Sequence, residues 1–388
     1  MNRVRVAILA VFTLLAISTV GGAAAISPDA TPQAPGGSNQ AKNSTQSIPT
    51  TQSGMVETQS TGDLPNKIFE QTYGTATDDI ANDLIKTEDG NFVIVGADTR
   101  TDGDFKAAIA KLTPTGEVVW DRTIESETNQ SFYSGKQTSD GGFILAGYRR
   151  QDAQDAGLAA KLDSEGRKEW SRAFTYGQGG TFEGAAETSD GEFLFAGSIE
   201  TTDGDDDAEV VKTTADGTIK WNFSYSHRYS SASQSFYGIA AGESGTYYLA
   251  GEEYDKGNWD AMSMEINSVG EEQISDIYGH DQLDDWFSDV AVTVGDGPYY
   301  AGLRNGIWDE SDNEYDFGDG WVYHDDLGSW SETKSQTDFN RFLRIDSSDR
   351  SVTAVGFTRT KDADYVEGYA ASYSNEGVER WNLSTRSA

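Results

Sequence analysis

The decapeptide KLDSEGRKEW, residues 161–170, contains a turn and a Trp that the chain repeats. Comparable segments are KLTPTGEVVW at 111–120, KTTADGTIKW at 212–221 and SYSNEGVERW at 372–381, and in all four Gly precedes Trp by four positions. An apolar run ending in Gly recurs with them, at Gly96, Gly147, Gly197, Gly251, Gly302 and Gly356, so successive glycines are 50 to 54 residues apart. Six units with a period near fifty residues indicate a repeat architecture.

Each unit contains four β-favouring stretches separated by Asp/Gly-rich turns. In the first unit these are DIANDLIKT (79–87), FVIVGA (92–97), AAIAKL (107–112) and WDRTI (120–124). Four strands of this kind predict one antiparallel sheet. Six such sheets without helices favour an all-β protein, a β-propeller of six four-stranded blades, over a β-solenoid, whose coils are shorter. The segment KIFEQTYG (67–74) also resembles an outer strand, so seven blades or a closing N-terminal strand are alternatives.

The repeated Trp residues predict a structural role. Trp120, Trp170, Trp221 and Trp381 open the outermost strand of their units, where the ring can lie across the neighbouring blade and the indole N–H can find an acceptor. The fourth unit departs from the pattern, with Gln273 expected at the Trp position, and the fifth has Trp330 only after a shift of two residues.

The turn D-x-x-G-x-x-x-W and the unit built around it resemble known propeller repeats. KLDSEGRKEW is similar to the blade repeat of pyrroloquinoline-quinone enzymes and their non-enzymatic relatives, and the whole unit resembles the propeller repeats of secreted and cell-surface proteins of halophilic archaea. The resemblance covers residues 67–385 and implies the propeller fold. Quinone enzymes usually have eight blades and a Thr in the turn, whereas six units without that Thr are present here.

Composition narrows the classes of partner. The chain of 388 residues carries 64 acidic and 29 basic residues, a formal charge of −35. Such acidity argues against nucleic acid, whose binding requires Lys and Arg, and against anionic membrane surfaces. Adaptation to very salty surroundings is favoured over a dense set of calcium ligands, because the acids are spread along the whole chain. No Cys is present, which excludes disulfides and thiolate sites.

The N-terminal region predicts export. Arg3 and Arg5 precede a short apolar run, and Ala23 and Ala25 have the spacing that signal peptidase recognises, so residues 1–25 are interpreted as a signal peptide. Residues 26–66 are rich in Ser, Thr, Gln and Pro and predict a disordered linker. Residues 67–388 then form the propeller. We expect a secreted or cell-surface monomer without a transmembrane anchor after cleavage.

Unequal loops indicate where a ligand binds. Loops between blades and loops between second and third strands emerge on the same face of a propeller. In the fourth and fifth units they contain YDKGNWDA (254–261), YGHDQLDDWFSD (278–289) and RNGIWDESDNEYDFGDGW (304–321). Exposed aromatic residues beside carboxylates suit a glycan or a protein partner. The candidate ligand-binding residues are Trp259, Trp286, Trp308, Trp321, Asp284 and Asp285; roofing of the loops is the alternative role.

Two further kinds of site are suggested by short motifs. Asp203, Asp205 and Asp207 alternate as at the start of a calcium loop, although the later Gly and Glu of an EF-hand are absent, and residues 308–321 offer a similar set of acids. Sequons for N-glycosylation stand at Asn43, Asn129, Asn222 and Asn382.

No catalytic constellation is evident in the sequence. The favoured function is therefore a non-catalytic binding or scaffold propeller outside the cell. A secreted enzyme acting by quinone chemistry or on polysaccharide, and a structural protein of the cell envelope, are the alternatives.

Overall fold

The computed structural model describes most of the chain from residue 79 onward. Its gaps are 100–103, 152–153, 176, 203, 227–231, 256, 280–281, 294, 310–313, 325–330, 335–337, 349–350, 361–366 and 386–388. Before residue 79 it describes β1 (Ala24–Ala25), β2 (Val56–Glu57) and β3 (Phe69–Glu70). Among the described residues, no helix is long and apolar enough to cross a bilayer.

The described chain is almost entirely β-structure, and the first three units each form a separate four-stranded antiparallel sheet. The first contains β4 (Ile80–Lys86), β5 (Phe92–Thr99), β6 (Phe105–Leu112) and β7 (Val118–Thr123). The second contains β8 (Gln130–Gln137), β9 (Phe143–Gln151), β10 (Gln154–Leu162) and β11 (Lys168–Phe174). The third contains β12 (Gly179–Glu187), β13 (Phe193–Glu200), β14 (Asp206–Thr213) and β15 (Ile219–Tyr225).

The fourth unit is a separate sheet, and the last two share one. The fourth contains β16 (Ser233–Ala241), β17 (Tyr247–Asp255), β18 (Asn258–Ile266) and β19 (Glu272–Tyr278). The fifth contains β20 (Asp284–Thr293), β21 (Gly297–Asp309), β22 (Glu314–His324) and β23 (Ser331–Lys334). The sixth contains β24 (Asp338–Ser348), β25 (Ser351–Thr360), β26 (Glu367–Ser374) and β27 (Glu379–Thr385).

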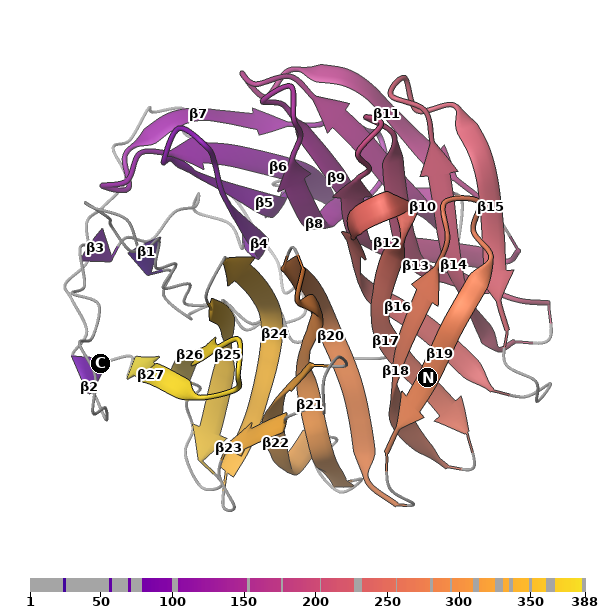
Figure 1. Ribbon diagram of the computed structural model, residues 1–388. Helices are drawn as coiled ribbons and strands as arrows, with labels where there is room; N and C mark the ends of the chain where they lie inside the picture. The colour runs from indigo at the N-terminus through magenta and orange to yellow at the C-terminus, as the bar shows by residue number, and fades with distance from the viewer. Residues whose placement is uncertain are drawn as a thin grey trace, which may run out of the picture.

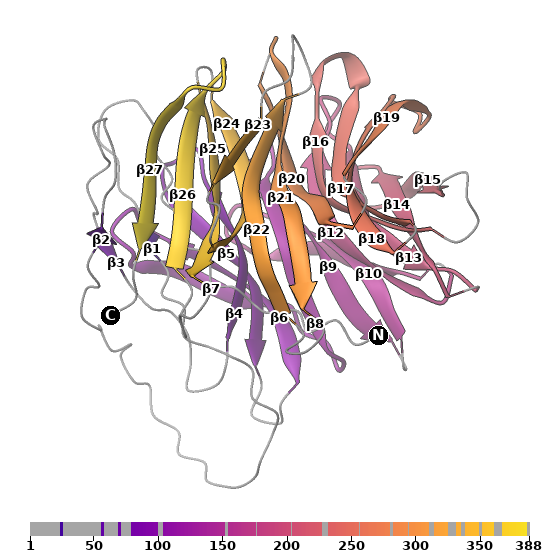
Figure 2. The same cartoon turned by 90° about the horizontal axis from the view of Figure 1, so that it is seen from below.

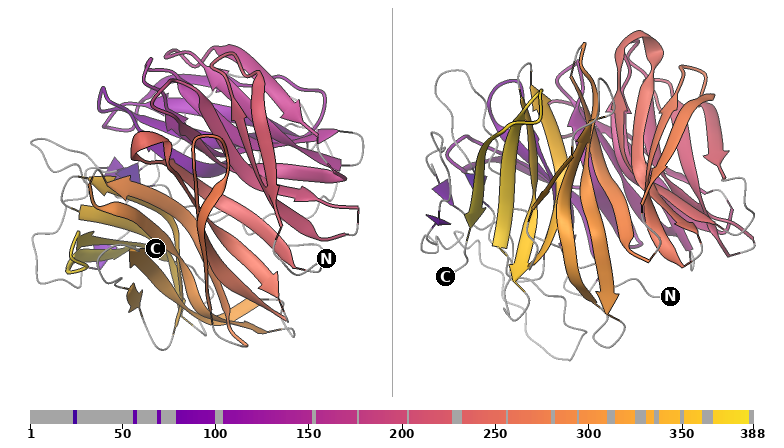
Figure 3. Two further views of the ribbon diagram at one scale, coloured as in Figure 1. Left: turned by 45° about the vertical axis from the view of Figure 1, so that its right-hand side comes forward. Right: turned by 60° about the horizontal axis from the view of Figure 1, so that its bottom comes forward.

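The sheets are arranged in a ring, as Figure 1 shows from the indigo first unit to the yellow last one. The five sheets of four or more strands comprise four single units and a nine-stranded sheet, in which one parallel bridge, Gly318↔Phe339, joins the fifth and sixth units. The first strands β4, β8, β12, β16, β20 and β24 contact one another in succession and form the inner wall. Figures 2 and 3 show the same sheets from other sides. The all-β propeller fold predicted from the repeat is confirmed.

The strand that adds to the last unit lies earlier in the chain than expected. β2, which falls inside the predicted linker, pairs antiparallel with β27 at the outer edge of the last unit. The described part of the segment 67–74 is β3, which instead pairs in parallel with β1.

The repeated Gly of each apolar run has a steric cause. Every inner strand has a β-bulge opposite this Gly, and a Cβ there would lie about 2 Å from a backbone carbonyl oxygen of the inner strand. For Gly147 the distance to Ser131 O would be 2.0 Å. The bulge bends the inner strand toward its neighbour, and only Gly leaves room for this approach.

The repeated turn and Trp hold neighbouring units together. Trp170 Nε1 donates a hydrogen bond to Ala215 O in the next unit at 2.9 Å, and its ring covers Gly217, where a Cβ would lie 2.9 Å away. Trp120 covers Gly166 in the same manner, and Trp221 lies close to Gly270. These three glycines also have positive φ, so the turn requires Gly for two reasons. These contacts explain the structural role predicted for the repeated Trp. Of the four residues, Trp381 is buried, at 6% exposed, whereas Trp120, Trp170 and Trp221 are partly buried.

One assignment within the repeat was wrong. Lys161 pairs with Trp170 across β10 and β11, and the corresponding pair in the fourth unit is Glu265 with Ile274. Ile274, not Gln273, therefore occupies the Trp position, and it is 51% exposed. Trp330 lies outside the described residues.

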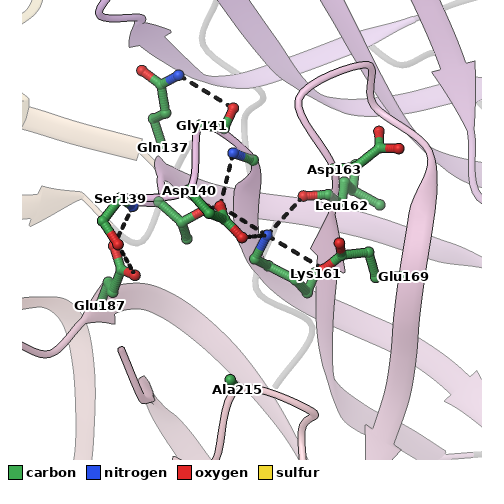
Figure 4. Close-up of polar contacts among 12 residues, drawn as sticks. Gln137, Ser139, Asp140, Gly141, Lys161, Leu162, Asp163, Glu169, Glu187 and Ala215 are labelled. Carbon is green, nitrogen blue, oxygen red and sulfur yellow. Dashed lines mark hydrogen bonds and ion pairs between the residues drawn. The ribbon is translucent and has the colours of Figure 1, made fainter. Parts of the chain in front are cut away.

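The repeat also contains a Lys–Asp ion pair at the same end of the strands as the Trp-containing turn, in which the Lys is buried and the Asp is exposed. Lys161, 2% exposed, lies 2.9 Å from Asp140 Oδ2 and 3.4 Å from Glu169 Oε2, and it donates to Leu162 O at 3.1 Å (Figure 4). Burial alone would raise the pKa of Asp140, but hydrogen bonds from Thr138, Lys161 and Gly142 lower it to about 2. The same pair recurs in the first unit as Lys111 with Asp89, 2.7 Å apart.

Candidate functional site

Most of the predicted ligand-binding residues gather at one end of the ring, which we call the front face. At this end β17 finishes and β18 begins, β20 and β24 begin, and β21 turns into β22. Trp259 lies at the start of β18, Asp284 to Trp286 open β20, and Trp308 lies near the end of β21. The Trp308 side chain is outside the described part of the structure. Antiparallel strands thus place loops far apart in the sequence next to one another.

An aromatic pair marks the fourth unit at the front face. Tyr254 on β17 pairs with Trp259 on β18, and their ring centroids are 5.0 Å apart at an interplanar angle of 49°. Tyr254 is 37% exposed and Trp259 is half-buried. The two rings are therefore held by a strand pair, and both keep some surface in contact with solvent.

Asp284 fixes this pair against the fifth unit. Its Oδ1 accepts a hydrogen bond from the backbone N–H of Trp259 at 2.9 Å, and its Oδ2 accepts one from the Tyr315 hydroxyl at 2.8 Å. Burial raises the pKa of Tyr315, and Asp284 raises it further, so this phenol stays protonated and keeps donating. A carboxylate positioned by two donors retains lone pairs for a further partner.

Asp285 has a different environment from its neighbour. It is 1% exposed, and its Oδ1 accepts a hydrogen bond from the backbone N–H of Asn305 at 2.9 Å. Asn305 has φ +58°, and its side chain donates to Asp319 at 3.2 Å. Asp285 therefore holds an irregular residue of β21 in place. This position gives it no exposed surface for a ligand.

The expectation that Trp286 and Trp321 are exposed loop residues was wrong. They are 5% and 3% exposed, because β20 and β22 extend through the segments that the sequence suggested were loops. Trp321 packs against Phe287 in the core between the fourth and fifth units, with centroids 4.6 Å apart. Trp286 packs edge-on against Tyr315, with centroids 5.4 Å apart. Neither indole N–H has a hydrogen-bond partner among the described residues.

Sequence reasoning missed Arg341, which lies over Trp286. The Arg341 guanidinium carbon is 4.6 Å from the Trp286 ring centroid, and its Nη2 is 3.5 Å from Ser288 Oγ. The neighbouring Tyr237 hydroxyl donates to Glu252 at 2.5 Å. Like Asp284 and the aromatic pair, these residues lie near the front ends of strands in the fourth to sixth units, although Glu252 is buried.

A signal for Arg341 was present in the repeat. In each unit the carbonyl oxygen of the residue before the inner-strand bulge lies against the repeated Gly, and in chain order these residues are Ile80, Ser131, Thr181, Ser235, Trp286 and Arg341. Large polar or aromatic side chains therefore replace smaller ones at this position only in the last two units. Aligning the units on the bulge, which the sequence alone does not display, would have revealed the change.

The acidic loop at the third unit does not form a recognisable metal centre in the described residues. Asp203 lies outside them, and no group of three or more potential ligands is present in the part of the chain that they cover. Asp205 O accepts a backbone hydrogen bond from Thr201 at 2.8 Å. Burial raises the pKa of Asp207, and Asp205 raises it further.

The three described sequons differ in accessibility. Asn222 is exposed on β15, whereas Asn129 and Asn382 are half-buried. The Asn129 side chain accepts a hydrogen bond from Phe105 N at 2.8 Å, and Asn382 donates to Glu379 at 2.6 Å. Asn43 lies outside the described residues.

Comparisons with known proteins find similarity of fold only. No family model matches the chain, and no curated protein matches it. A solved protein of unknown function from Bacteroides caccae is 15% identical, with a TM-score of 0.44 over 71% of this chain and 89% of that one. The Pan2 WD40 domain of Neurospora crassa is 10% identical, with a TM-score of 0.41 over 79% of this chain and 90% of that one. The β-propeller domain of the Trilobed protease of Pyrococcus furiosus is 9% identical, with a TM-score of 0.38 over 76% of this chain and 94% of that one.

Proposed function

We propose that the protein is an extracellular β-propeller that binds carbohydrate at the front face of its fourth to sixth units. The observation that carries the proposal is the Tyr254–Trp259 pair, partly exposed and fixed beside the Asp284 carboxylate. Aromatic rings offer apolar surface to the faces of sugar rings, and a fixed carboxylate accepts hydrogen bonds from sugar hydroxyls. Binding residues of this kind concentrate in segments positioned by a rigid scaffold.

The arrangement supports glycan binding better than a broad protein interface. The exposed apolar surface of the pair is small, whereas a stable protein interface buries about 800 Å² on each partner. The polar groups of Asp284 and Arg341 are anchored by neighbouring strands, which lowers the entropic cost of ordering them on binding.

Binding should be tested with a glycan array followed by calorimetric titration of the best ligand. We expect Trp259→Ala and Tyr254→Ala to weaken binding about tenfold or more. Phe223→Ala is the matched control, because Phe223 is an aromatic residue 41% exposed on the outer strand of the third unit. Absence of binding to any glycan at millimolar concentration, or equal losses in the control, would overturn the proposal.

The extracellular location rests on the N-terminal sequence. Ala23 and Ala25 precede the expected cleavage site, and the protein is proposed to act in the salty medium that its acidity suggests. Sequencing the N-terminus of protein recovered from the medium should give Ile26 as the first residue; an intact Met1 would contradict export by cleavage.

A further inference from the structure

Arg341 and Arg344 lie three residues apart on β24 but differ in their counter-charges. Arg344 forms an ion pair with Asp83 at 3.4 Å and donates to Tyr133 O at 2.9 Å, so it connects the sixth unit to the first and second. Burial alone would lower the pKa of Arg344, but Asp83 and Asp289 raise it overall. Arg344 is therefore satisfied by carboxylates of the protein itself.

Arg341 has no such partner among the described residues. No carboxylate there lies within 4.0 Å of it, and its Nε is buried without a hydrogen-bond acceptor. Burial lowers the pKa of Arg341, and the more distant Tyr237 and Glu252 offset this only in part. In a chain with 64 acidic residues, an arginine at the ligand-binding end without an ion pair is unexpected.

The geometry leaves the Arg341 guanidinium suited to an anion. Its guanidinium carbon lies 4.6 Å from the centroid of the Trp286 ring, and the residue is mostly buried but keeps some surface in contact with solvent. Contact with the ring restrains the group, whose edge carries the N–H donors that bind carboxylate or sulfate through two parallel hydrogen bonds. A strongly bound anion also supplies the counter-charge that the protein does not provide.

We propose that the carbohydrate bound at the front face is acidic, and that Arg341 binds its carboxylate or sulfate group. This inference rests on the proposed function, since it specifies the class of sugar taken by the same face. Tyr254 and Trp259 contact the sugar ring, and Arg341 distinguishes charged from neutral residues of the chain.

The test compares matched pairs of oligosaccharides by calorimetric titration. One pair is an oligogalacturonate and its neutral methyl ester; the other is a sulfated galactan oligosaccharide and its desulfated form. We expect wild-type protein to bind the acidic member of one pair at least about tenfold more tightly than its neutral counterpart. The pair that shows this preference tells whether the bound group is a carboxylate or a sulfate. Arg341→Gln should abolish this preference and leave the affinity for the neutral member unchanged.

Two variants serve as controls. Arg122→Gln makes the same change in net charge at the outer strand β7, where Arg122 lies 5.7 Å from the Trp120 ring, and it should retain the preference. Arg341→Lys keeps the charge but lacks the planar donors, so it should retain only part of the preference for the acidic member. If Arg341→Gln is unfolded under the conditions of the titration, Arg341→Lys is tested in its place. Equal wild-type affinity within both pairs, or a preference that survives in Arg341→Gln, would overturn the acidic-ligand proposal while leaving carbohydrate binding intact. Failure to bind any member would overturn both.

Discussion

Replacement of Trp170 by Ala tests whether the repeated Trp joins neighbouring units. Full truncation of a buried Trp typically costs about 3–5 kcal/mol. Trp170 is only partly buried, so its ring contacts with Phe193 and Phe195 should account for about 2 kcal/mol. Loss of the hydrogen bond to Ala215 O adds about 1 kcal/mol. The expected destabilisation is therefore about 3 kcal/mol.

The assay is urea unfolding, with the free energy taken from the midpoint where the slope is unchanged. Trp170→Phe keeps the ring contacts and lacks the indole N–H, so it should cost about 1 kcal/mol. Val119→Ala, a 50% exposed position on β7, should stay within about 0.5 kcal/mol of wild type. Losses below about 0.5 kcal/mol in both Trp170 variants would refute the role assigned to the repeat.

Three further outcomes follow from individual contacts. Gly147→Ala should prevent folding or lower stability by more than about 3 kcal/mol, because its Cβ would lie 2.0 Å from Ser131 O; a wild-type melting curve would contradict the account of the bulge. Burial raises the pKa of Glu209 to about 7, although Asn222 opposes this. Stability should therefore fall as pH rises from about 4.5 to 7, by roughly 3 kcal/mol at most, and Glu209→Gln should flatten that part of the urea-derived profile. The native protein should carry glycan at the exposed Asn222, which peptide mass spectrometry checks against unmodified peptide.

The sequence predicted the fold because its signals are local and repeated. The apolar runs ending in Gly and the turns leading to Trp recur with one period; the structure places each run in a second strand and each turn between the third and fourth strands. The bulge opposite Gly147 was not predicted, since it arises from pairing between strands. Ile274, in contrast, lies four positions after Gly270, the same spacing that separates Gly from Trp in the other units, so the sequence does identify it as the residue at the Trp position of the fourth unit.

The candidate site was predicted only in part. Trp259 and Asp284 were found because they depart from the repeat, and the structure brings them together. Trp286 and Trp321 also depart from the repeat, yet both are buried. Their strands are longer than the composition of these segments suggests, and the length of the strands decides which residues are covered. Arg341 belongs to a strand more than fifty residues from Trp286, so their contact depends on packing between units.

The most direct test of the central claim is a crystal structure of the protein with the glycan selected on the array. The account predicts the sugar over Tyr254 and Trp259, within hydrogen-bond distance of Asp284 and with an acidic group against Arg341. A glycan bound to the outer strands, or to the ends of the strands where Lys161 and Asp140 lie, would contradict it.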